Sequence, residues 1–237
     1  MNGVLIIDKP RGWTSHDVVM KVKGALRAGK VGHLGTLDPA ATGVLPLVVN
    51  GATSFAIRLG SGSKTYAARL KLGEETDTCD ADGSVIRSGD YSAVTPQMVC
   101  DALMSFTGRI KQTPPMYSAV KRGGVPLYKL ARKGVIMERE PKEVEIEAID
   151  IEKVAIPFVS FTMTCSKGTY VRSLCHDAGV RLGCGAHLAE LRRTACGAFR
   201  IDEAVGPSEE SLILKGRIIP LEEALLRASP ATALAAV

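Results

Sequence analysis

The chain has 237 residues, of which 46% are hydrophobic and 23% are charged, and its formal net charge is +5 at pH 7. This is the composition of a globular protein with one large domain, or one domain and an appendage, and it excludes low-complexity and repeat classes. Residues 1–8 lack the basic start and long apolar core of a signal peptide, and no long uncharged apolar run follows. We therefore expect a cytoplasmic protein without a membrane segment.

The N-terminal part of the chain combines short apolar runs with one amphipathic segment. Ser15 is a candidate N-cap for a helix that ends at Leu26, because apolar residues recur on one face. Strict alternation over Thr65–Leu72 predicts a half-buried strand, which an acidic loop ending at Gly83 follows. The other predicted elements here are a strand over Gly3–Ile7, a strand over Val44–Val49 and a short helix over Thr53–Leu59.

The C-terminal part continues this mixture. Thr95-Pro96 opens a helix to about Phe106, since proline suits the first helical position. We also predict paired strands over Val144–Val154 and Phe158–Cys165, a helix that starts at Gly168-Thr169, and a strand over Ala198–Ile201. There is no regular βαβ rhythm, which indicates an α+β fold with a mixed, largely antiparallel sheet. We expect residues 226–237 to form a disordered tail.

Residues 109–142 concentrate positive charge. They hold nine basic residues and two acidic ones, an excess larger than the net charge of the whole chain. Tyr117 and Tyr128 lie among them, with prolines and glycines between. The pattern is typical of a mobile arm that contacts phosphates, although a solvated charged face has the same composition.

Residues 32–46 contain a single carboxylate, Asp38, among small residues. The following proline moves Asp38 toward an extended backbone, and Gly35 and Gly43 allow sharp bends on either side. Such a loop, at the edge of the strand over Val44–Val49, can present a nucleophile to a large flat substrate. An ordinary surface turn is the alternative, because Asp-Pro pairs favour turns.

Three further features accompany this loop. Tyr66 lies on the apolar face of its strand, as a core aromatic residue also would. Arg172 lies near a predicted helix start, where the dipole disfavours a cation, so we expect it to reach a carboxylate; a surface arginine is the alternative. Gly183–Leu188 is interpreted as a loop that leads to Leu191-Arg192-Arg193.

The cysteines do not predict a metal site. All six are scattered without a C-x-x-C pair, as reduced thiols of a cytosolic protein are. Cys175, His176, Cys184 and His187 are close in sequence, but their spacing matches no common zinc framework.

Together these features resemble the bacterial family of tRNA pseudouridine(55) synthases, the TruB type. The resemblance runs in order over residues 2–225. Its motifs are Asn2–Leu5 with Asp8–Pro10, Gly32–Pro46, Lys64–Tyr66, Thr76–Thr78 with Asp80–Gly83, Pro115–Ala119, Cys165–Ser173 and Gly183–Arg193.

The resemblance implies three catalytic residues. Asp38 corresponds to the family's catalytic aspartate, which attacks C1′ of the ribose or assists departure of the base to a glycal. Arg172 corresponds to the arginine that keeps this carboxylate ionised. Tyr66 corresponds to the tyrosine that stacks on the uracil and is a candidate for removing the C5 proton.

The resemblance also implies substrate contacts. Tyr170 and Leu191 match positions that line the uracil pocket, and His33 matches a histidine that contacts RNA near the flipped nucleotide. Lys64 belongs to the motif of the active-site tyrosine. For Lys9 we expect a mainly structural role in packing, with contact to RNA as a secondary role. No metal or organic cofactor is implied.

The implied architecture is a pseudouridine synthase catalytic domain over residues 1–225, with residues 109–142 as a basic thumb-like insertion. The implied partner is the T-arm of tRNA, whose uridine is flipped out of its stack, and we expect a monomer. Many members continue into a C-terminal PUA domain, which this sequence does not include; either the protein lacks that domain or the sequence is a shortened form. A tRNA-folding chaperone with incidental catalysis is the main alternative. A synthase guided by a small RNA is disfavoured by the compact motifs and the lack of long basic tails.

Overall fold

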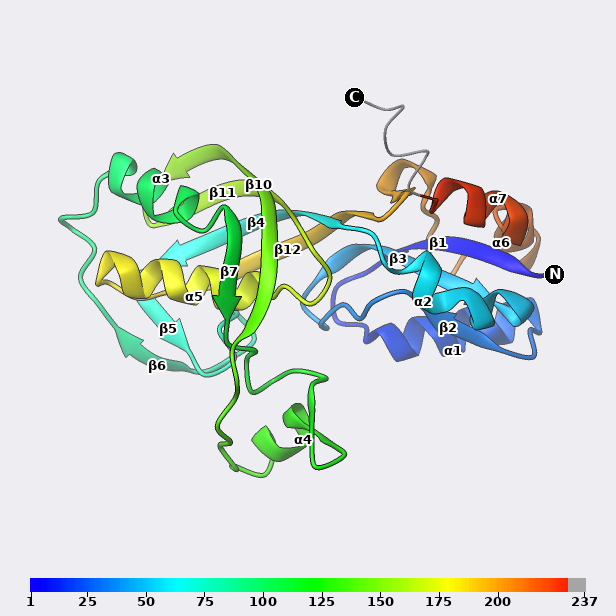
Figure 1. The fold of residues 1–237 in the computed structure, drawn as a ribbon, viewed down its shortest axis with the longest axis horizontal. Coiled ribbons are helices and arrows are strands. Elements are labelled where there is room, and N and C mark those ends of the chain that lie inside the picture. The colour runs from blue at the N-terminus through cyan, green and yellow to red at the C-terminus, as the bar shows by residue number, and fades with distance from the viewer. Residues whose placement is uncertain (230–237) are drawn as a thin grey trace. The chain divides into compact units, whose positions relative to one another are not determined.

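The computed structural model describes residues 1–229, which form two compact units (Figure 1). Unit 1 combines Met1–Tyr66 with the described residues from Leu191 onward, and unit 2 is Ala67–Glu190. The tail predicted for residues 226–237 lies mostly outside the described residues. Its first two residues, however, end helix α7 (Leu221–Arg227), so the predicted boundary was too early.

Unit 1 is built on a mixed sheet. Strand β1 (Gly3–Lys9) pairs antiparallel with β3 (Thr42–Val49), and β12 (Ala186–Cys196) pairs parallel with β3 through Arg192 and Arg193. Three short strands complete it: β2 (Val31–His33) on β3, β13 (Phe199–Arg200) on β12 and β14 (Ile219–Pro220) on β1. The helical elements are α1 (Ser15–Leu26), η1 (Asn50–Phe55), α2 (Ala56–Leu59), η2 (Ile201–Glu203), α6 (Ser211–Gly216) and α7.

The strands β1 and β3 form because both are nearly continuous apolar runs, which bury both faces. Val4, Ile6, Val44 and Val48 pack on one side into a core with Phe199. This packing confirms the predicted strands. The helix predicted over Thr53–Leu59 is instead a 3₁₀ turn followed by the single turn of α2.

Helix α1 confirms the predicted span but not its cap. The N-cap is Thr14, whose hydroxyl accepts from the Asp17 N–H at 3.1 Å while the Asp17 carboxylate accepts from the Thr14 N–H at 2.8 Å. This reciprocal pair is a capping box. Ser15 is therefore the first helical residue, and its hydroxyl is directed elsewhere.

Unit 2 contains an antiparallel sheet in the order β4 (Lys64–Leu72), β11 (Phe158–Cys165), β10 (Lys142–Ala155) and β7 (Gly108–Gln112). The β4 strand starts in unit 1 and alternates between buried and half-buried residues as predicted. Helices α3 (Pro96–Met104), capped by Thr95, and α5 (Val171–Leu182) lie in the same unit. Part of the predicted acidic loop is a hairpin of β5 (Glu74–Thr76) and β6 (Val85–Ser88).

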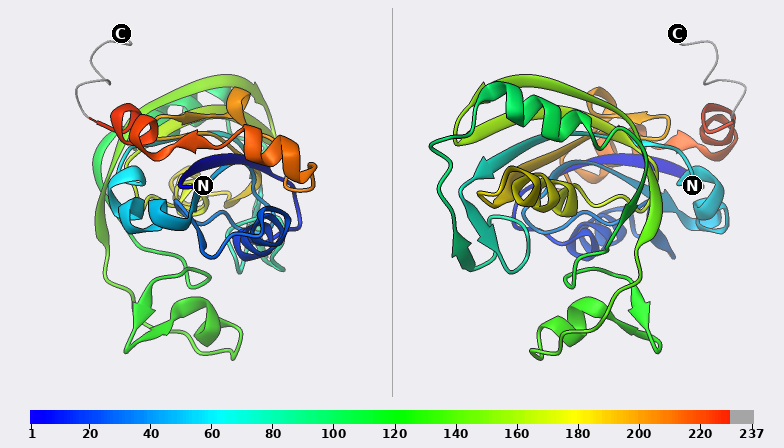
Figure 2. Two further views of the ribbon diagram at one scale, coloured as in Figure 1. Left: turned by 90° about the vertical axis from the view of Figure 1, so that its right-hand side faces the viewer. Right: turned by 60° about the vertical axis from the view of Figure 1, so that its left-hand side comes forward.

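The basic segment 109–142 is only partly an insertion. Its first residues belong to the edge strand β7, which pairs with β10. The remainder projects from unit 2 and carries β8 (Lys121–Arg122), β9 (Val125–Pro126) and helix α4 (Leu127–Ala131), as Figure 2 shows. The small hairpin and helix carry Lys121, Arg122 and Lys129, and the other basic residues lie in β7, in β10 or outside regular elements. The mobility predicted for this arm stays a prediction.

The mixed, largely antiparallel sheets and their helices confirm the α+β class. Two further local predictions were wrong. Helix α5 begins at Val171 rather than at Gly168-Thr169, and β12 begins at Ala186, within the segment interpreted as a loop. Within residues 1–229, no helix is long and apolar enough to cross a bilayer.

Candidate active site

The Asp38 loop connects β2 to β3 in unit 1. Leu34 begins it by donating to the Pro46 carbonyl at 2.9 Å, and a turn closes where the Ala41 N–H donates to the Asp38 carbonyl at 3.1 Å. Leu34 and Leu37 are buried, whereas Asp38 itself is half-buried. The two buried leucines therefore anchor the loop in the core, while the Asp38 side chain stays near the surface.

Two fully buried cations hold the backbone of this loop. The Lys9 ammonium donates to the carbonyls of Pro10, Trp13 and Pro39, at 3.0, 2.6 and 3.2 Å. The Arg193 guanidinium donates to Val44 O at 2.7 Å and to Gly35 O at 3.0 Å. Buried charges require such polar partners. Lys9 and Arg193 thereby fix the loop path around Asp38.

Gly43 is required because β3 and β12 approach closely. A Cβ at this position would lie 2.2 Å from the Arg193 carbonyl oxygen, and the residue has φ of +98°. Both conditions exclude other residues. The parallel pairing of Arg193 with Gly43 depends on this approach, so the glycine that the sequence interprets as a bend also admits the strand that carries Arg193.

His33 ends β2 at the start of the same loop. Burial lowers the pKa of His33, and the nearby charges of Arg193 and His16 lower it further. Its Nδ1 is buried, and no described residue forms a hydrogen bond with it. His33 is therefore neutral near pH 7, when it can both donate and accept hydrogen bonds.

The other predicted residues of unit 1 lie on β4 and β12. Lys64 and Tyr66 are buried, and the Lys64 side chain runs past Gly35 on the Asp38 loop. Leu191 is half-buried. The next residue, Arg192, forms a two-point ion pair with Asp8 at 3.1 and 2.7 Å.

Arg172 lies in unit 2, near the start of α5, and is buried. It donates to Thr78 O at 3.0 Å and to Tyr117 O at 2.7 Å, and Asp80 Oδ2 lies 3.6 Å away. The carboxylate near Arg172 in unit 2 is that of Asp80, whereas the predicted partner was Asp38, and that pairing stays a prediction. Sequence reasoning did not select Asp80, although it lies in one of the motifs behind the resemblance.

Tyr170 is the N-cap residue of α5. Its backbone exchanges two hydrogen bonds with the Gln112 amide, at 2.7 and 3.0 Å, which ties the helix start to β7. Gln112 was also missed, because a lone glutamine in a basic segment carries no distinctive signal.

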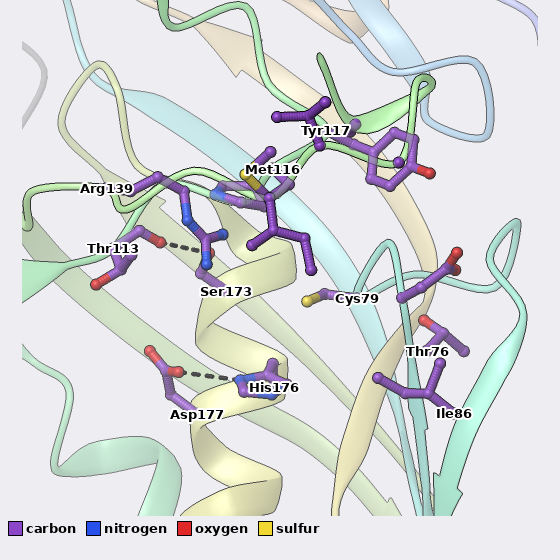
Figure 3. A pocket seen from close by; sticks show the side chains of 16 residues that line it. Thr76, Cys79, Ile86, Thr113, Met116, Tyr117, Arg139, Ser173, His176 and Asp177 are labelled. Carbon is purple, nitrogen blue, oxygen red and sulfur yellow. Dashed lines mark hydrogen bonds and ion pairs between the residues drawn. The ribbon is translucent and has the colours of Figure 1, made fainter. Parts of the chain in front are cut away.

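A cavity of about 760 Å³ lies beside these groups within unit 2. Figure 3 shows Cys79, Tyr117 and Arg139 on its walls, with His176 and Asp177 from α5. The hydrogen bond that His176 donates to the Asp177 carboxylate raises the pKa of His176. Burial raises the pKa of the Cys79 thiol, so this thiol is not an activated nucleophile. In the described part of the chain, no group of three or more histidine, cysteine or acidic side chains could hold a metal ion.

Comparison with known proteins places this arrangement in a family. Residues 23–171 match the family model for the N-terminal domain of TruB family pseudouridylate synthases, and residues 172–226 match the C-terminal domain of tRNA pseudouridylate synthase B. The tRNA pseudouridine synthase B of Geobacter sulfurreducens is 53% identical over 86% of this chain and 67% of its own length. That of Opitutus terrae is 45% identical over 94% and 95%.

A solved structure, the crystal structure of a Cbf5-Nop10-Gar1 complex, contains a chain that is 31% identical with a TM-score of 0.73. The match covers 95% of this chain and 62% of that one. This chain thus spans about two thirds of the Geobacter relative and less of the solved chain. With the motifs around Asp38 and Arg172, these matches establish that the chain belongs to the TruB family of pseudouridylate synthases.

Proposed function

We propose that this protein isomerises uridine to pseudouridine at position 55, in the T-loop of tRNA. The observation that carries the proposal is the half-buried Asp38, on a loop held by buried side chains, in a chain of this family. The relatives that match most of the chain are named tRNA pseudouridine synthase B, which supports tRNA as the substrate.

The reaction breaks the C1′–N1 bond, turns the uracil, forms a C1′–C5 bond and releases the C5 proton. No atom is gained or lost overall except by exchange of that proton with water, so the chemistry requires no redox partner. We assign Asp38 as the carboxylate that either attacks C1′ or assists departure of the base to a glycal. Both routes require the ionised form.

Arg172 is the proposed cation that favours this ionised form. Its contacts with Thr78, Tyr117 and Asp80 orient the guanidinium, as a group that stabilises charge must be oriented before the reaction. Tyr66 is the proposed stacking partner of the everted uracil and candidate acceptor of the C5 proton. Its burial within the strand supports a ring packed from behind.

Substrate contacts are proposed for His33, Tyr170, Leu191 and Lys64. Lys9 was expected to pack first and contact RNA second, and its buried ammonium on three carbonyls favours the packing role. The charges of residues 109–142 would supply salt-sensitive affinity for the T-arm phosphates. The monomeric state, the cytoplasmic location and the single catalytic domain over residues 1–225 are parts of the same proposal.

The test compares wild type with Asp38→Asn on a tRNA transcript whose uridines carry tritium at C5. Wild type should release the label from one uridine, whereas Asp38→Asn should bind the tRNA equally well and release none. A transcript with cytidine at position 55 should keep its label. Wild type that binds but releases nothing would favour the chaperone alternative, and release by Asp38→Asn at the wild-type rate would refute the assignment of Asp38.

A further inference from the structure

The Ser15 hydroxyl contacts the residue immediately before Asp38 rather than the end of its own helix. Ser15 Oγ donates to the Leu37 carbonyl at 3.0 Å and accepts from the Leu37 N–H at 2.9 Å. The capping task is performed by the exposed Thr14. The two adjacent hydroxyls therefore have separate tasks, one in helix α1 and one in the Asp38 loop.

Both polar groups of Leu37 depend on this contact. Ser15 is 3% exposed and Leu37 is 4% exposed, so water cannot readily replace the hydroxyl. A hydroxyl can donate one hydrogen bond and accept others, so Ser15 satisfies both backbone groups at once. Its removal would leave a buried donor and a buried acceptor unpaired, and the loop would have to move to expose them.

Such a movement would reach Asp38 directly. The Leu37 carbonyl, the Asp38 nitrogen and the Asp38 Cα lie in one rigid peptide plane, so the hydrogen bond that fixes this carbonyl also fixes the plane that carries Asp38. On the other side, the Asp38 carbonyl accepts from the Ala41 N–H at 3.1 Å, and the Pro39 carbonyl, one peptide further on, accepts from Lys9 and from the Gly12 N–H. Ser15 thus anchors the peptide before Asp38, while a turn and Lys9 hold the two peptides after it.

We propose that Ser15 is a positioning residue for Asp38, an inference that rests on the proposed function of Asp38. Ser15 contacts neither RNA nor reacting atoms; it sets the orientation from which the carboxylate acts. A displaced catalytic group of this kind costs about 10- to 100-fold in rate. Binding of tRNA should change little, because no charged or stacking group is removed.

The experiment measures tritium release in single turnovers at saturating enzyme, tRNA binding by filter retention, and the thermal midpoint. The variants are Ser15→Ala and Thr14→Ala, with Asp38→Asn as the inactive reference. Thr14→Ala is the matched control, because it removes a neighbouring hydroxyl that stabilises the same helix but does not contact Leu37. Ser15→Cys retains a weaker donor and acceptor, and should give an intermediate rate.

We expect Ser15→Ala to lose about 10- to 100-fold in the single-turnover rate with tRNA affinity within about twofold of wild type. Thr14→Ala should keep the wild-type rate even if its thermal midpoint falls as far as that of Ser15→Ala. The inference is overturned if Ser15→Ala reacts at the wild-type rate, if both variants lose rate in proportion to their midpoints, or if affinity falls as much as rate. A wild-type protein without tritium release would instead refute the proposed function. If Ser15→Ala does not fold, Ser15→Cys is compared with Thr14→Ala by the same criteria.

Discussion

Replacing Gly43 by alanine tests the close approach of β3 and β12 at the catalytic loop. The added Cβ would lie 2.2 Å from the Arg193 carbonyl oxygen and 2.9 Å from its nitrogen, so one strand must shift. Such overpacking costs about 1–3 kcal/mol. The φ of +98° adds strain of about 1–2 kcal/mol for a side chain. We therefore expect the free energy of unfolding to fall by about 3 kcal/mol.

The matched control is Gly12→Ala. Gly12 has a similar φ of +84°, but nothing lies within 4 Å of its added Cβ, so only the backbone strain remains. The single tryptophan, Trp13, is in unit 1 and reports unfolding by fluorescence. If the free energy of unfolding falls by about 3 kcal/mol per M of urea, Gly43→Ala should lower the urea midpoint by about 1 M and Gly12→Ala by about half of that. Equal shifts would show that backbone conformation alone, and not the contact with Arg193, requires glycine at position 43.

Three further predictions concern charge. Arg172→Lys should lower the tritium-release rate more than tRNA affinity, because one ammonium cannot replace a fork that contacts both Thr78 and Tyr117; equal losses in the two assays would contradict this role. The lowered pKa of His33 means that the unfolded chain binds a proton more readily, so the associated stability is present above the ordinary histidine pKa of about 6.5 and is lost as pH falls toward the folded value. His33→Gln should therefore reduce the fall in urea midpoint between about pH 7.5 and pH 5.5, and an unchanged fall would assign it to other groups. Lys133→Ala, in the exposed part of the basic segment, should reduce the slope of log affinity against log salt by about one if it contacts a phosphate, whereas an unchanged slope would place it off the RNA.

Periodicity predicted much of the fold. The alternation in β4 and the apolar runs of β1 and β3 were sufficient to predict these three strands, because the burial of side chains repeats regularly along each strand. The start of β12 was interpreted as a loop, because glycines precede this strand and two arginines lie further along it. Arg193 can lie in a buried strand because carbonyls about 150 residues away along the chain accept hydrogen bonds from its guanidinium. No local sequence pattern indicates such partners.

The candidate site was less predictable from local patterns. A lone carboxylate among small residues and a cation near a helix start singled out Asp38 and Arg172, but an ordinary turn and a surface arginine fit the same patterns. The family resemblance decided for both residues, and their roles stay predictions. The acidic loop has five acidic residues between Glu74 and Asp82, none of which was predicted as a partner of Arg172, and only the fold selects Asp80. In the same way, Ser15 was predicted as the cap in place of Thr14, because the distant partner of Ser15 is invisible in sequence.

The hydrogen bonds from Lys9, Ser15 and Arg193 to the catalytic loop have a practical consequence for redesign. All of them are formed with main-chain atoms of the loop, so they fix the path of the backbone independently of the side chains that the loop carries. The exposed positions, such as Thr36, are then open to substitution as long as the glycines remain. A library that varies those positions tests whether the proposed RNA substrate can be changed while the backbone that carries Asp38 stays in place.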